Sequence, residues 1–69
     1  MKVSARNTLK GKVIKMTDGA VNSEVVIELP GGQQVISIIT KNSVESLNLT
    51  VGCEAYAIVK ASNVMVGVE

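Results

Sequence analysis

The sequence predicts an all-β domain, a small and partly open Greek-key barrel of about five strands with one short helix. Three observations lead to this prediction. Apolar and polar residues alternate over short runs, turn residues separate the runs, and only one short stretch carries helix-start signals. The 69 residues are enough for one domain, residues 1–69, without internal repeat or linker.

The first two predicted strands flank a Thr-Asp-Gly turn at residues 17–19. Residues 9–16 carry apolar side chains at both odd and even positions, with lysines between them. Residues 20–29 then alternate, with four apolar residues on one face: Val21, Val25, Ile27 and Leu29. This alternation is typical of a half-buried antiparallel strand.

A Pro-Gly-Gly turn at residues 30–32 leads into the third predicted strand, residues 33–40. Its apolar residues occur on both faces: Val35, Ile36, Ile38 and Ile39. One small sheet can hardly cover both faces of this strand by itself. We therefore expect a second molecule to cover one of them.

The single predicted helix follows the third strand. Asn42 is expected to cap its first turn, with Glu45 returning a hydrogen bond to the cap backbone, and Asn48 is expected to end it. Residues 53–60 and 64–68 are the fourth and fifth predicted strands. Five short strands with a helix between the third and fourth match a barrel of the OB type.

A chain of this size hides only about 60% of the surface that it exposes when unfolded, so an additional source of stability is expected. One cysteine, Cys53, cannot form a disulfide within the chain, and one cysteine without histidine excludes a structural zinc site. Oligomerisation is the remaining source. A hydrophobic content of 46%, mostly in Val, Ile, Leu and Ala, supports an oligomer.

We expect neither a signal peptide nor a membrane-spanning segment. The first residues are polar and charged, unlike a signal peptide, and no apolar run approaches the ~20 residues that span a bilayer. We therefore expect a soluble, cytoplasmic protein that makes no contact with a membrane. The unpaired Cys53 fits a reducing compartment.

The N-terminal stretch has a local positive charge although the formal net charge is only +1. Five of the seven basic residues lie there, without an acidic residue among them: Lys2, Arg6, Lys10, Lys12 and Lys15. Basic residues at a strand edge are most often solvated charges that discourage edge pairing. A cluster of this kind also attracts anions, and we expect an anionic ligand near it.

Four sequence blocks follow one another along the chain: Ser-Ala-Arg-Asn with Leu-Lys-Gly at 4–11, Gly-Ala-Val with Glu-Val-Val at 19–26, Ser-Ile-Ile-Thr with Ser-Val and Leu at 37–47, and Lys-Ala-Ser-Asn-Val-Met-Val at 60–66. Together they resemble the molbindins, small molybdate- and tungstate-binding proteins called Mop, which are related to TOBE domains. The resemblance implies an OB-like fold assembled as a hexamer, a trimer of dimers, with oxyanion sites between subunits and no catalysis.

The resemblance also implies the site residues. One site would use a Ser-Ala-Arg-Asn segment of one chain and a Lys-Ala-Ser segment of another, which in this sequence are Ser4, Arg6, Lys60, Ala61 and Ser62. A second site near a threefold axis would use Gly19, Ala20, Val21 and Ser37. The bound ligand would be molybdate or tungstate, without direct protein–metal ligands and without a catalytic cofactor.

The chemistry of the first site agrees with that assignment. Molybdate is a tetrahedral dianion whose oxygens accept hydrogen bonds, so its site needs donors. Ser4, Arg6, Lys60 and Ser62 all donate, and a turn at Ala61 could add backbone N–H groups. Tungstate has the same charge and shape, so such a site would bind both ions. Reversible capture of this kind fits storage, buffering, homeostasis, delivery and sensing equally well.

Two other function classes are less favoured. An OB module for single-stranded nucleic acid stacks bases on aromatic side chains along a positive groove, whereas this chain has Tyr56 alone and a net charge of +1. We therefore expect no nucleic-acid partner. Enzymatic activity is not expected either, because the chain has no histidine, one cysteine and no recognisable carboxylate pair.

Overall fold

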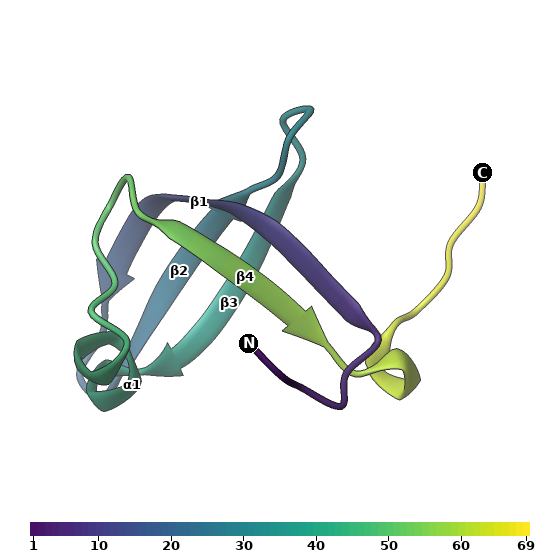
Figure 1. Cartoon of the computed structure of the whole chain (residues 1–69). Helices are drawn as coiled ribbons and strands as arrows, with labels where there is room; N and C mark the ends of the chain where they lie inside the picture. The colour runs from purple at the N-terminus through teal and green to yellow at the C-terminus, as the bar shows by residue number, and fades with distance from the viewer.

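The computed structural model describes all residues, 1–69, and consists mainly of one curled antiparallel sheet (Figure 1). Its elements are, in chain order, β1 (Asn7–Asp18), β2 (Asn22–Glu28), β3 (Gln34–Thr40), α1 (Lys41–Ser46), β4 (Glu54–Val59) and the 3-10 turn η1 (Ala61–Asn63). The strand order in the sheet is β3-β2-β1-β4. The prediction of an all-β domain with one short helix is confirmed.

The long strand β1 connects the two halves of the sheet. Its first half pairs with β4 and its second half with β2. The register with β2 shifts between Val13 and Lys15, as in a β-bulge, which bends a strand and increases its twist. The shift explains the apolar residues at both odd and even positions, because Val13 and Met16 both reach the core although they differ in parity.

The hydrophobic core is small. It consists of four buried residues, Val13, Val25, Ile27 and Ala57, with partly buried side chains around them. Ser23 is also buried, and its hydroxyl donates a 2.6 Å hydrogen bond to the Asp18 carboxylate, which lies opposite it in the β1–β2 pair. The buried polar side chain therefore has its partner.

Much of the apolar surface has no cover in a single chain. On β3, Val35 and Ile39 are half-buried, whereas Ile36 and Ile38 are 63% and 69% exposed. The prediction that one sheet leaves one face of this strand bare is confirmed. Val21 was expected on the buried face but is 70% exposed, because β2 begins only at Asn22.

The prediction of a fifth strand over residues 64–68 is wrong for the isolated chain. These residues have no regular structure, and Figure 1 shows them leaving the sheet as an extended tail. A strand needs a hydrogen-bonding partner, and after η1 the tail runs away from the sheet. The barrel of one chain therefore has four strands rather than five.

The N-cap of the helix lies two residues earlier than predicted, at Thr40 rather than Asn42. Thr40 is the N-cap, and its hydroxyl oxygen accepts a hydrogen bond from the Ser43 N–H at 3.1 Å. Asn42 and Glu45 do not form the predicted capping box, because β3 extends to Thr40 and the helix follows directly. Asn48 ends it as predicted, with a φ of 52°. No helix here combines the length and apolar character that crossing a membrane requires.

The close approach of β1 to β2 at Gly11 gives a test of this packing. A Cβ at Gly11 would lie 2.5 Å from the Glu28 carbonyl oxygen and 2.7 Å from the Ile27 Cγ2. Gly11→Ala should therefore lower the free energy of unfolding by about 1–3 kcal/mol, as overpacking does, measured by urea denaturation. Lys12→Ala, at the exposed next residue, is the control. Equal urea midpoints for the two variants would contradict the close packing of Gly11 against β2.

Candidate functional site

Two segments from opposite ends of the sequence meet in one hollow of about 500 Å³. Six residues line it: Ser4, Ala5, Arg6, Lys60, Ala61 and Ser62. All five residues predicted for the first site are among them. The fold therefore brings together in one chain what the sequence alone could connect only through a family resemblance.

The pairing of β1 with β4 produces this arrangement. The ladder ends with Asn7 opposite Val59. Arg6 directly precedes Asn7 and Lys60 directly follows Val59, so one further step along the antiparallel pair leads to both basic residues. Figure 1 shows the start of β1 and the turn η1 at the same end of the sheet.

The turn η1 keeps the second segment at that end. The Asn63 N–H donates to the Lys60 carbonyl oxygen at 2.9 Å, and the Val64 N–H donates to the Ala61 carbonyl oxygen at 3.2 Å. The chain therefore turns directly after β4, where Ala61 and Ser62 contribute to the hollow. The predicted turn at Ala61 is confirmed.

The hollow of a single chain is too large and too open to enclose one oxyanion. Its volume is about 500 Å³, and it is open to solvent. Five of its six lining residues are exposed and Ala5 is half-buried. The family resemblance implies a site whose two segments come from different chains, and within one chain both segments already line the same hollow.

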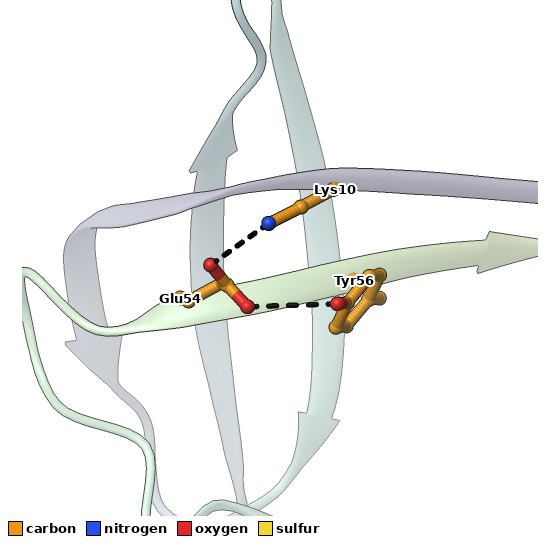
Figure 2. Close-up of polar contacts among 3 residues, drawn as sticks. All are labelled: Lys10, Glu54 and Tyr56. Atoms are coloured by element: carbon orange, nitrogen blue, oxygen red, sulfur yellow. Dashed lines mark hydrogen bonds and ion pairs between the residues drawn. The ribbon is translucent and has the colours of Figure 1, made fainter. Parts of the chain in front are cut away.

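Charge in the hollow is purely positive, because its lining contains Arg6 and Lys60 and no carboxylate. Another early lysine does have a partner: Figure 2 shows Lys10 on β1 reaching Glu54 on β4, with an N–O distance of 3.2 Å. Tyr56 also points its hydroxyl at Glu54, 3.5 Å away, a weak contact. Elsewhere, His, Cys, Asp and Glu side chains form no cluster of three that could hold a metal ion.

The second predicted site does not assemble in one chain. Gly19 lines a hollow with the acidic residues Asp18 and Glu24, which would repel an anion. Ser37 lines a separate, apolar hollow. The predicted residues are thus distributed over different places on the chain.

The remaining two residues of that site, Ala20 and Val21, line a third hollow beside the start of α1. Lys41 contributes to the same hollow, and its backbone N–H donates to the Val21 carbonyl oxygen at 3.0 Å. The sequence did not predict that Lys41 lies beside Ala20 and Val21. Its position depends on the pairing of β2 with β3, in which Asn22 lies opposite Thr40.

Comparison with known proteins found similar sequences and structures. The sequence pattern of the TOBE domain matches residues 3–66. The chain is 55% identical over 69 residues to a probable molybdenum-pterin-binding protein of Haemophilus influenzae, with 100% of both chains covered. It superposes on MopII from Clostridium pasteurianum with a TM-score of 0.91 and 46% identity, covering 97% of this chain and 100% of that one. The cytoplasmic molybdate-binding protein ModG, with molybdate bound, gives a TM-score of 0.95 and 46% identity, covering 100% of this chain and 49% of that one.

Proposed function

The chain belongs to the TOBE domain family and is a molbindin, and from this premise we propose that it binds molybdate without catalysing a reaction. The hollow between residues 4–6 and 60–62 is the proposed site. One observation carries the proposal: the two segments predicted from sequence line a single hollow whose charged groups are all cationic.

The side chains of this hollow suit a tetrahedral dianion. Arg6 can direct a planar fork of donors at two oxygens, and Lys60 adds a point charge. The hydroxyls of Ser4 and Ser62 can donate to the remaining oxygens. Because the lining has no carboxylate, no group in it would repel the bound ion.

The ligand we propose is the free oxyanion rather than a molybdenum–pterin complex, although the name of the Haemophilus influenzae relative mentions pterin. A pterin ring is flat, and sites for such rings are lined mainly by apolar and aromatic side chains. Apart from Ala5 and Ala61, the hollow is polar. Tyr56, the one aromatic residue, lies in a different hollow.

Tungstate is included in the proposal, because it presents the same charge and the same tetrahedral set of acceptors. We assign the protein to intracellular molybdenum storage, buffering or homeostasis in the cytoplasm. The molybdate-binding neighbour ModG is described as cytoplasmic, which supports the location. No aromatic platform for nucleic-acid bases accompanies the basic residues, so the proposal includes no nucleic-acid partner.

We also propose that the working form is a homo-oligomer, a hexamer built as a trimer of dimers. The open hollow needs a further wall to hold one ion, and a second copy would supply it. The exposed Ile36 and Ile38 of β3 need cover as well. In such an assembly the oxyanion would lie between subunits, as would any second site around Gly19, Ala20, Val21 and Ser37.

Light scattering at micromolar protein tests the assembly. The expected mass is near six times the 7.2 kDa of one chain, because apolar surface of this extent is unfavourable in water. A folded monomer under these conditions would refute the oligomer, and with it the proposal that a second copy closes the site.

Substitution of Arg6 tests the site itself. Arg6→Ala should weaken molybdate binding by about 1.5–3 kcal/mol, the usual contribution of a hydrogen bond to a charged group. Arg6→Lys keeps the charge but loses the planar fork, so it should weaken binding less than the alanine variant and still measurably. Equilibrium dialysis with molybdate provides the affinities.

Lys12→Ala is the matched control for Arg6→Ala. It removes one positive charge from the same basic stretch, but Lys12 lies in a different hollow that also contains Glu28 and Glu54. Its effect on affinity should be small and should fade as salt screens it. An equal loss for Lys12→Ala and Arg6→Ala would mean that molybdate responds to a diffuse field, and the site assignment would be wrong.

A further inference from the structure

Six residues precede the sheet, Met1 to Arg6, and they belong to no strand or helix. This N-terminal segment carries Ser4 and Arg6, two of the four donors in the proposed oxyanion hollow, and it joins β1 at Asn7. None of the 12 backbone hydrogen bonds outside the regular elements involves it, and none of the side-chain hydrogen bonds does. A segment without such bonds has little local stability, so its donors need another source of order.

The free end of the segment lies at a second hollow. Met1 lines it together with residues of the core and of strand β4, among them Ile27, Tyr56 and Ile58. This hollow has a volume of about 330 Å³, and nine of its eleven lining residues are hydrophobic. We call it the apolar hollow. Figure 1 shows the segment turning back from the start of β1 toward the middle of the sheet, which brings the N-terminus to this place.

The N-terminal segment therefore joins two hollows of opposite chemistry. Its first residue lies at the apolar hollow, and residues 4–6 line the oxyanion hollow. Three residue steps separate Met1 from Ser4, and an extended chain spans at most about 3.6 Å per residue. A fixed Met1 thus confines Ser4 to within roughly 11 Å of it, whereas a free Met1 leaves Ser4 held from the β1 side alone.

The Met1 side chain suits an anchoring role. Methionine is unbranched, flexible and apolar, so it fits irregular apolar spaces. Met1 remains 75% exposed, which places it at the mouth of the apolar hollow and makes the contact a modest one. Val3 is the other large apolar residue of the segment, and it lines neither hollow. Of the two, Met1 alone reaches the apolar hollow.

We propose that Met1 is a positioning residue for the oxyanion site. Its side chain holds the N-terminus in the mouth of the apolar hollow, and the segment fixed in this way presents Ser4 and Arg6 to the ligand. An ion that binds to a mobile segment has to order it and loses affinity by that cost, whereas a segment already ordered avoids the cost. The role in molybdate binding rests on the proposed function, but the anchoring of the segment does not.

The two donors depend on this anchor to different degrees. Arg6 directly precedes Asn7, whose pairing with Val59 holds the segment from its other end. Ser4 lies three residues before Asn7 and has no such support. Loss of the anchor should therefore release Ser4 more than Arg6, and this gradient along the segment distinguishes a lost anchor from general unfolding.

Backbone relaxation measured by NMR without molybdate tests the anchor. Met1→Ser, released from a cleavable N-terminal fusion so that serine becomes the first residue, should lower the heteronuclear NOE of the Ser4 amide more than that of Arg6. The value for Ala57, in the core, should not change. Met1→Leu keeps an apolar side chain and should restore the NOE at Ser4. Val3→Ser, in the same segment but away from the apolar hollow, is the control and should have little effect. An unchanged NOE at Ser4 in Met1→Ser, or an equal fall in Val3→Ser, would overturn the proposal.

Molybdate affinity, measured by equilibrium dialysis, provides a second readout. Met1→Ser should raise the dissociation constant about three- to tenfold, the usual cost of ordering one flexible group. Met1→Leu should restore it, Val3→Ser should leave it nearly unchanged, and the mass of the assembly should be the same for all three variants. An unaltered dissociation constant in Met1→Ser would refute the positioning role. If the unsubstituted chain bound no molybdate, the proposed function would fail, and the relaxation measurement would still decide whether Met1 anchors the segment.

Discussion

The antiparallel pairing of β1 with β4 is the interaction on which the candidate site depends. Its last pair is Asn7 with Val59. The segments that continue beyond this pair, residues 4–6 and 60–62, therefore lie at the same end of the sheet. Arg6 and Lys60, the residues next to this pair, therefore line the same hollow. A slip of one residue would invert the faces of β4, exposing Ala57 and removing it from the core.

A second constraint is the size of the core. Five apolar residues are buried, in a chain that is 46% hydrophobic. Burial contributes roughly 25 cal/mol per Å² of apolar surface, so the exposed side chains on β3, on β4 and in the tail represent stabilisation that a single chain does not obtain. Assembly would obtain it. In the proposed assembly stability and function would be linked, because residues 60–62 of the hollow directly precede the exposed tail.

Local signals in the sequence predicted the strands, the turns and the helix within a few residues, because alternation and turn chemistry act over short distances. The errors came from longer-range effects. Thr40 replaced Asn42 as the cap because the β2–β3 pairing continues to Thr40. Residues 64–68 have the alternation of a strand but no partner within the chain. The residues of the first site were predicted through the family blocks, whereas the proximity of Arg6 to Lys60 follows only from the β1–β4 register.

Calorimetric titration of the protein with molybdate is the most direct test of the central claim, that the chain binds this oxyanion. The donor hollow predicts saturable binding, with a molybdate-to-chain ratio that stays the same when the titration is repeated with tungstate, since both dianions present the same four acceptors. Absence of binding heat for both ions, confirmed by equilibrium dialysis at millimolar concentration, would contradict the account.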